Sequence, residues 1–346
     1  MILVVILALL GLLFVFEASV AEAFTTFGDQ YHFLKQHVVW LGLGLAGMTI
    51  ASFIPLQLWE KLSRPLFVMS LIFLVMVFLP GIGRELNGAH RWIFLGSVRF
   101  QPIEVVKFSL IVYFASWLSK HQRLGPFLFT IGLPSVLLLL QPDLGSLLVL
   151  VSVAVAMYFV AGGKLAHLLA ISSIGVGLVS LAVLTSSYRW ERLQTFLNPA
   201  SDPLDSGFHM RQITLALGRG GLFGQGIGNS RQKFSYIPEA STDSIFAIIT
   251  EEVGLVGSLV FLILFGLMFT MMVKTIGRAP SRSFAQLLGW GIFSWIAVQA
   301  LLNLSAVVSL VPLTGIPLPF ISYGGTSLVM ILFATGVLLR IGKEYN

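Results

Sequence analysis

Long apolar stretches, separated by short polar segments, run along most of this 346-residue chain. A helix needs roughly 20 predominantly apolar residues to span a bilayer, within a range of about 17 to 25. Ten stretches approach that length, at about 1–16, 38–56, 65–80, 103–118, 126–141, 144–162, 165–184, 244–273, 284–308 and 325–341. The pattern predicts an all-α polytopic integral membrane protein with about ten transmembrane helices.

The composition agrees with a membrane protein. Hydrophobic residues make up 56% of the chain and charged residues only 10%, whereas a soluble domain is about 25% charged. The chain has no cysteine, so disulfide and thiolate chemistry are excluded. The net charge of +6 comes from short scattered clusters and not from a basic patch, so we expect no nucleic-acid partner. No Lys or Arg precedes Lys35, and we interpret the first stretch as an uncleaved helix.

Basic residues in alternate short loops predict the orientation, because cytoplasmic loops are enriched in Lys and Arg. They are Lys61 and Arg64, then Lys120 and Arg123, then Lys164, then Lys274, Arg278 and Arg282, and finally Arg340 and Lys343. Both termini are therefore expected in the cytoplasm. Residues 1–346 are interpreted as a single membrane domain, with a large extracytoplasmic loop at 185–242 between spans seven and eight.

Three of the segments expected to face outward have distinctive compositions, and loops as long as the largest of them usually carry function. Residues 80–101 are rich in Gly, Arg and aromatic side chains. The large loop contains MRQITLALGRGGLFGQGIG, which suggests a short interfacial helix before a glycine-rich turn. Residues 311–325 hold three prolines and repeated glycines, which predict irregular backbone in an apolar segment. Such backbone is tolerated in a membrane only where protein covers it or where it lines a wet cavity.

Asp243 lies where the large polar loop meets a long apolar helix. One interpretation is a helix N-cap, since Ser241, Thr242 and Asp243 are all favoured capping residues. The other is a general base at the membrane surface, because partial withdrawal from water brings a carboxylate pKa toward the working range. The two roles are compatible with each other.

Glu251 and Glu252 follow in the same apolar helix, roughly 12–13 Å further along its axis. Carboxylates at that depth are costly unless they are paired or protonated. These two acids either form hydrogen bonds to neighbouring helices and fix the packing, or they have a functional role. Helical geometry turns Glu252 away from Asp243, so both acids cannot line one cavity with it.

Three more charged residues lie inside or beside spans. Glu104 and Lys107 are three apart and therefore share a helical face, as a structural ion pair or as a cation held ready for an anionic ligand. Asp143 is either a functional acid or the N-cap of the sixth span.

Nine basic residues in the outward segments form a further candidate site. Arg84, Arg91 and Arg99 lie in the first segment, and Arg189, Arg192, Arg211, Arg219, Arg231 and Lys233 lie in the large loop. Each alone is typical of solvated surface charge. Together they are suited to a phosphate-bearing lipid head group, with Arg91, Arg192 and Lys233 as the candidates we retain. The histidines have no metal-ligand spacing.

Seven ordered blocks resemble one known family: GAHRWIFLG, FQPIEVVK, QPDLGS, RWERLQTFLNP, GNSRQKFSYIPEASTD, EEVGLVG and PLTGIPLPFISYGGTS. They look like the SEDS family of bacterial cell-wall synthesis, to which the FtsW, RodA and SpoVE proteins belong. The resemblance covers nearly the whole chain and is somewhat closer to the division and sporulation branch. Ser241 stands where His is common, Ser244 where Phe is common, Ile103 within the block that usually reads QPSE, and Ser309 where Gly is frequent.

The resemblance implies a ten-span peptidoglycan glycosyltransferase in the bacterial cytoplasmic membrane. It would polymerise lipid II, with inversion, on the outer face, and a class B penicillin-binding protein would be its partner. Asp243 matches the acid implicated in catalysis, and it could also hold a divalent cation, Mg²⁺ or Mn²⁺. Lys107, Glu104, Arg91, Arg192, Lys233 and Asp143 are substrate-binding candidates. A lipid II flippase and a non-catalytic scaffold of the division machinery remain alternatives.

Overall fold

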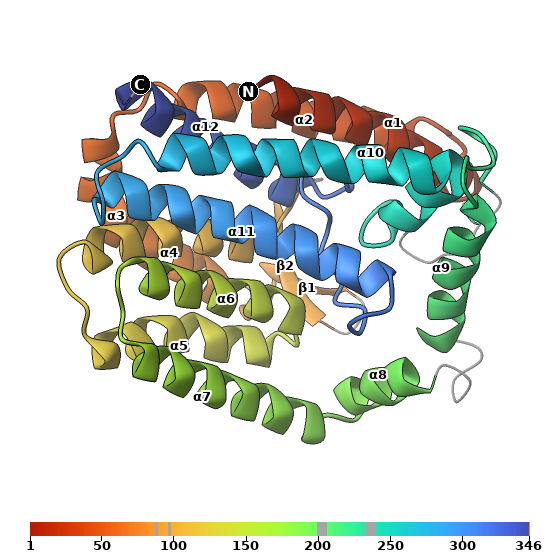
Figure 1. Ribbon diagram of the computed structural model, residues 1–346. Coiled ribbons are helices and arrows are strands. Elements are labelled where there is room, and N and C mark those ends of the chain that lie inside the picture. Colours follow the sequence, from red (N-terminus) through yellow and green to blue (C-terminus); the bar gives the residue numbers. More distant parts are fainter. Residues whose placement is uncertain (87–88, 96–97, 199–205, 231, 233–239, 346) are drawn as a thin grey trace. The chain divides into compact units, whose positions relative to one another are not determined.

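A computed structural model describes residues 1–86, 89–95, 98–198, 206–230, 232 and 240–345 (Figure 1). In these ranges the chain is predominantly helical. The helices are α1 (Ile2–Phe27), α2 (His32–Ala51), α3 (Leu56–Met76), α4 (Pro102–Leu118), α5 (Leu124–Leu140), α6 (Leu144–Val160), α7 (Leu165–Leu184), α8 (Ser187–Leu197), α9 (Ser206–Gly220), α10 (Ile245–Ile276), α11 (Phe284–Val307) and α12 (Gly325–Glu344).

Each of the ten apolar stretches corresponds to one helix, so the helical membrane class is confirmed. Among the described residues, four helices are long and apolar enough to cross a membrane, namely α1, α10, α11 and α12, or five if the bent pair of α2 and α3 forms one span. Shorter apolar helices include α5 and α6. The chain is thus a multi-pass membrane protein, and the ten-span topology stays a prediction.

The N-terminal helices differ from the predicted bounds. The first helix was expected to end at about residue 16, but α1 continues to Phe27 and α2 already begins at His32. Ser19 and Ala23 are buried, so tertiary packing extends the helix beyond its most apolar part. Lys61 and Arg64, expected in a loop, lie within α3, which is bent by 118° from α2. Pro55 precedes α3 and has no backbone N–H to continue α2.

A small antiparallel sheet occupies the segment at 80–101, where the sequence predicted a loop. Its strands β1 (Gly83–Leu86), β2 (Ala89–Leu95) and β3 (Val98–Phe100) follow one another in chain order. Ile93 pairs with Gly83 on one side and Phe100 on the other, and its side chain is buried. The helical class stands, and this small sheet is an addition to it that the sequence did not predict. Its strands pair their polar backbone groups where no helix forms.

The chain divides into two compact units, each built from separate parts of the sequence. Unit 1 comprises residues 1–42, 179–269 and 299–324, and unit 2 comprises 43–178, 270–298 and 325–346. In unit 2, α4 packs against α3, α6 and α12, and α5 packs against α6. Gly291 of α11 lies so close to Ile111 and Met157 that an added Cβ would be 2.5 Å from the Ile111 side chain. Small residues permit this close helix packing inside a membrane.

Residues 311–324, in unit 1, form no helix or strand, as the prolines predicted. Protein covers this segment: Gly11 of α1 is so close that a Cβ there would be 2.5 Å from the Phe320 carbonyl oxygen. The amide of Leu318 donates to Ser322 Oγ at 2.8 Å. Irregular backbone is therefore satisfied by neighbouring protein, as a membrane environment requires.

The helix α10 is broken at Gly254, whose φ of 69° and ψ of −172° are not helical. The turn that follows α9 forms hydrogen bonds with the backbone on both sides of the break. The amides of Gln225 and Gly226 donate to the carbonyls of Glu251 and Glu252 at 2.9 and 3.0 Å. In return, the amides of Leu255 and Val256 donate to the carbonyls of Gly221 and Leu222 at 2.9 and 3.1 Å. Four main-chain hydrogen bonds thus join the glycine-rich turn to α10.

Candidate functional site

Asp243 lies half-buried in a turn, two residues before α10 begins at Ile245. Its neighbours Ser241 and Ser244 are buried. The carboxylate oxygen Oδ1 accepts long hydrogen bonds of 3.4 Å from the hydroxyls of Thr242 and Ser244. The acid therefore lies at the junction of the polar segment and the apolar helix, as the sequence predicted.

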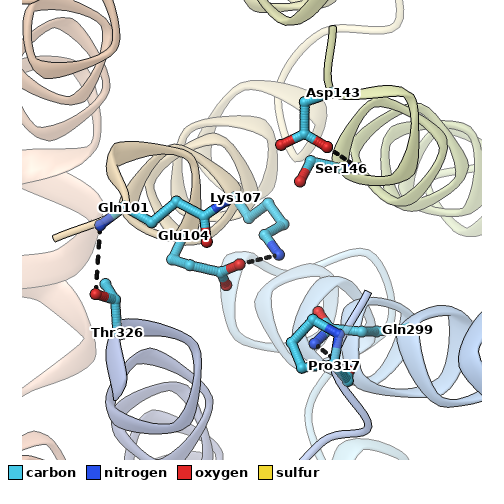
Figure 2. Close-up of polar contacts among 8 residues, drawn as sticks. All are labelled: Gln101, Glu104, Lys107, Asp143, Ser146, Gln299, Pro317 and Thr326. Carbon is cyan, nitrogen blue, oxygen red and sulfur yellow. Dashed lines mark hydrogen bonds and ion pairs between the residues drawn. The ribbon is translucent and has the colours of Figure 1, made fainter. Parts of the chain in front are cut away.

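Two amide side chains of α11 contact the segment at 311–324, and one of them also contacts the backbone of Asp243. Asn303 Nδ2 donates to the Asp243 carbonyl at 2.7 Å and to the Ile316 carbonyl at 2.8 Å. One turn earlier, Gln299 Nε2 donates to the Pro317 carbonyl at 3.0 Å (Figure 2). The Tyr323 amide donates to the Ser241 carbonyl at 2.8 Å. The irregular segment at 311–324 and the start of α10 are therefore fixed to each other.

A histidine from α9 reaches the same turn. His209 Nε2 lies 2.9 Å from Ser244 Oγ, and that hydroxyl lies 3.4 Å from Asp243 Oδ1. His209 is partly buried and Ser244 fully buried. The structure thereby connects an imidazole to the candidate base through one hydroxyl group.

Glu251 and Glu252 are both buried in α10. Glu251 Oε2 accepts a 2.5 Å hydrogen bond from Ser230 Oγ and a 3.4 Å hydrogen bond from the amide of Gln232. These contacts come from the polar segment after α9. They agree with the packing interpretation of Glu251, although its partners lie in this segment and not in a neighbouring helix. Glu251 therefore holds Ser230 and Gln232 of this segment against α10.

In unit 2, Glu104 and Lys107 form the predicted ion pair on α4. Lys107 Nζ lies 2.7 Å from Glu104 Oε1, and each side chain is only 3% exposed. Figure 2 shows the ammonium directed at the carboxylate. The ammonium also lies 5.3 Å from the ring centroid of Trp295 on α11, which adds a cation–π attraction. Removing the Lys107 ammonium would leave the buried Glu104 carboxylate without its ion-pair partner.

Asp143 is the N-cap of α6, in agreement with the capping interpretation. Its Oδ1 accepts a 3.0 Å hydrogen bond from the Ser146 amide (Figure 2). Close to the start of α4, the Gln101 amide donates to Thr326 Oγ1 at 3.3 Å, which connects that end of α4 to α12. The hydrogen bond from Ser146 gives Asp143 a structural role at the start of α6, and its role in substrate binding stays a prediction.

The structure places two of the three basic candidates. Arg91 of β2 donates from Nε to the Gln141 carbonyl at 3.3 Å and from Nη2 to the Pro142 carbonyl, so it supports the turn before α6. Arg192 of α8 is exposed and donates to the Leu313 carbonyl at 3.1 Å. Lys233 lies outside the described residues. A shared phosphate site for these side chains stays a prediction.

The possible divalent cation finds no built site in the described ranges. Within them, no group of three or more His, Cys, Asp or Glu side chains could hold a metal ion. A divalent cation at Asp243 stays a prediction, and no step proposed below uses it.

Sequence reasoning missed His209, Gln299 and Asn303. A signal existed for the two amides, since they are four residues apart and share one face of an apolar helix, where polar side chains mark packing or function. No sequence signal connects His209 with Ser244, because only the tertiary structure brings α9 to the start of α10.

Comparisons with known proteins identify the family of this chain. A family model described as "Cell cycle protein", covering FtsW, RodA and SpoVE, matches residues 1–346. The chain is 40% identical over 347 residues to the probable peptidoglycan glycosyltransferase FtsW of Coxiella burnetii, covering 97% of this chain and 93% of the relative. It is 38% identical over 351 residues to stage V sporulation protein E of Bacillus subtilis, covering 99% and 95%.

Solved structures share the fold. A chain of a peptidoglycan synthase complex that coordinates polymerization and crosslinking is 30% identical with a TM-score of 0.81, covering 99% of this chain and 96% of that chain. The rod shape determining protein RodA of Thermus thermophilus is 29% identical with a TM-score of 0.73, covering 99% and 95%. The whole-length match to the family model, together with relatives at this identity, establishes that the chain belongs to the FtsW/RodA/SpoVE family, the SEDS family.

Proposed function

We propose that this protein is a peptidoglycan glycosyltransferase that polymerises lipid II into glycan strands. The observation that carries the proposal is the fixed, half-buried position of Asp243 at the start of α10, in a chain whose relatives include a probable peptidoglycan glycosyltransferase over nearly their full length. The family supports the reaction, and the anchored carboxylate supplies a group that can perform it.

In this mechanism Asp243 acts as the general base. It accepts the proton of the attacking sugar hydroxyl while the hydroxyl oxygen forms a bond to the anomeric carbon of the second substrate. The bond from that carbon to the pyrophosphate breaks, and the electron pair leaves with the lipid pyrophosphate. Direct displacement inverts the anomeric configuration. Because pyrophosphate leaves as a stable anion, a second carboxylate to protonate the leaving group, as in ordinary glycosidases, is unnecessary.

The leaving pyrophosphate carries developing negative charge, which fixed cations stabilise. Lys107 and the outward arginines are the proposed sources of that positive charge. Lys107 is held by Glu104 in a buried ion pair at 2.7 Å, and such a held ammonium needs little reorganisation to meet an anion. Arg91 and Arg192 already contact main-chain carbonyls, so substrate phosphate would compete with or extend those contacts.

The proposed setting is the bacterial cytoplasmic membrane. The reaction occurs on the outer face, with ten spans, both termini in the cytoplasm, and the apolar surface of the outer leaflet accommodating the polyprenyl tails. A class B penicillin-binding protein is the proposed partner, supported by the similarity to a chain of a solved peptidoglycan synthase complex.

Reconstitution tests this function against its two alternatives. The purified chain is placed in vesicles with lipid II on the outer side, with and without a class B penicillin-binding protein, and glycan strands are separated by gel electrophoresis. Only an enzyme makes polymer when the substrate already lies on the correct side. A flippase would move labelled lipid II between leaflets without making polymer, and a scaffold would do neither, so either result would overturn the proposal.

A further inference from the structure

We propose that His209 is a positioning residue for the Asp243 carboxylate and that it acts through the hydroxyl of Ser244. This inference rests on the proposed function of Asp243 as the base. It adds two residues to the machinery of this site, one from α9 and one from the turn before α10.

The distances define a continuous chain of hydrogen bonds. His209 Nε2 lies 2.9 Å from Ser244 Oγ, and Ser244 Oγ donates to Asp243 Oδ1 at 3.4 Å. A serine hydroxyl has a single proton to donate. If it donates that proton to the carboxylate, it must accept from His209, so the imidazole carries its proton on Nε2. An ionised carboxylate is only an acceptor, and this direction therefore satisfies all three groups.

Burial strengthens this chain of hydrogen bonds. Ser244 is fully buried. On α9, Met210, which follows His209, and Ile213, one turn after His209, are also buried. Hydrogen bonds strengthen and polarise one another where water is excluded. An imidazole that donates to Ser244 thus makes its hydroxyl a better donor to Asp243, which orients the Asp243 carboxylate.

The helix that carries His209 is itself held against α10. At the other end of α9, Gly220 is so close to α10 that an added Cβ would be 2.2 Å from the Thr250 carbonyl oxygen. The next turn is bonded to the broken part of α10 through the main chain. The close contact of Gly220 and the main-chain hydrogen bonds of the next turn both hold α9 against α10. The position of His209 relative to Asp243 therefore does not depend on a single flexible side chain.

The test compares single variants, a double variant and a conservative replacement in the reconstituted polymerisation assay with lipid II. We expect H209A and S244A each to lower kcat roughly tenfold with KM nearly unchanged, as loss of an interaction that acts on the reacting group predicts. The double variant should be no slower than S244A, because both changes break the same chain. H209Q should recover most of the activity, since the glutamine amide can donate from a similar position.

Controls separate this inference from the function beneath it. Ser244→Ala removes one buried oxygen and little volume, and thermal unfolding of each detergent-solubilised variant measures its folding. If the unaltered chain polymerises lipid II while folded H209A and S244A keep its kcat, the inference is wrong and the proposed function stands. If the double variant loses kcat by the product of the two single losses, the two residues act independently and the inference is also wrong. No polymer from the unaltered chain would overturn the proposed function, and this inference with it.

Discussion

The side-chain amide of Asn303 donates a 2.7 Å hydrogen bond to the main-chain carbonyl of Asp243 and a 2.8 Å hydrogen bond to the carbonyl of Ile316. One buried amide on α11 therefore holds both the turn of the candidate base and the irregular segment at 311–324. The position of the acid is set by the backbone on which it stands, not only by its own side-chain contacts.

Replacing Asn303 by alanine should lower both stability and activity. Two carbonyls lose their donor, at a cost of about 1–3 kcal/mol for an unsatisfied buried group. A misplaced base also slows the reaction steeply, and a shift of about 1 Å can cost on the order of 100-fold. Thermal unfolding in detergent and polymerisation of lipid II measure the two effects. Asn229→Ala is the matched control, because Asn229 is exposed in a turn. Equal melting and equal activity of the two variants would refute the anchoring role.

The break in α10 predicts that replacing Gly254 lowers the stability of the protein. At Gly254 a Cβ would lie 2.3 Å from the Gly224 nitrogen, and the residue has a φ of 69°. Gly254→Ala should therefore unfold at a lower temperature, since such backbone strain alone costs about 1–3 kcal/mol and four main-chain hydrogen bonds are disturbed.

A second glycine of α10 serves as the control for that variant. Gly266 has open space around its Cβ position, so Gly266→Ala should be neutral or stabilising by up to about 1 kcal/mol. Differential scanning fluorimetry of both variants measures the contrast. The account of the break fails if both replacements shift the unfolding midpoint alike.

Removal of the lysine charge should cost more stability in the buried ion pair on α4 than in an exposed ion pair with the same N–O distance. Lys107→Met leaves Glu104 buried without its partner, at a cost of about 3–5 kcal/mol. Lys120 and Glu60 are also 2.7 Å apart but exposed, and Lys120→Met should cost less than about 1 kcal/mol. Chemical unfolding of the two variants measures this difference.

A double replacement tests whether Lys107 only stabilises the fold or also stabilises the leaving pyrophosphate. The neutral pair E104L/K107M should recover much of the lost stability, because matched apolar residues can replace a buried ion pair. We expect its polymerisation to stay low, since no ammonium remains to stabilise the leaving pyrophosphate. A double variant that is both stable and fully active would limit Lys107 to a structural role.

Hydrophobic periodicity predicted most of the helical scaffold. The apolar stretches locate α4, α6, α11 and α12 within a few residues, because helices buried in lipid or protein must be apolar over nearly their whole length. The end of α1 was misplaced, since residues up to Phe27 are held by packing that local hydropathy does not report. The strands at 83–100 were missed because short strands depend on pairing between segments and not on local pattern.

The candidate site was predictable only in part. Asp243, the Glu104–Lys107 pair and the Asp143 cap follow from local spacing and residue type, and the structure places them accordingly. The break at Gly254 and the contact of His209 with Ser244 arise between segments distant in sequence, so periodicity cannot reveal them. The sequence distinguishes Ser244 only as a departure from the family pattern, whereas the structure gives its hydrogen bonds to His209 and Asp243.

Polymerisation by the Asp243→Asn variant tests the central claim most directly. The asparagine keeps a side-chain oxygen to accept from Thr242 and Ser244 but cannot take a proton from the attacking hydroxyl. The control is Asp29→Asn, which alters an exposed acid paired with Lys35 at 2.7 Å. With lipid II and a class B penicillin-binding protein in vesicles, we predict that D243N folds normally and makes no glycan polymer, while D29N polymerises at the unaltered rate. Undiminished polymer from folded D243N would contradict the assignment of Asp243 as the base.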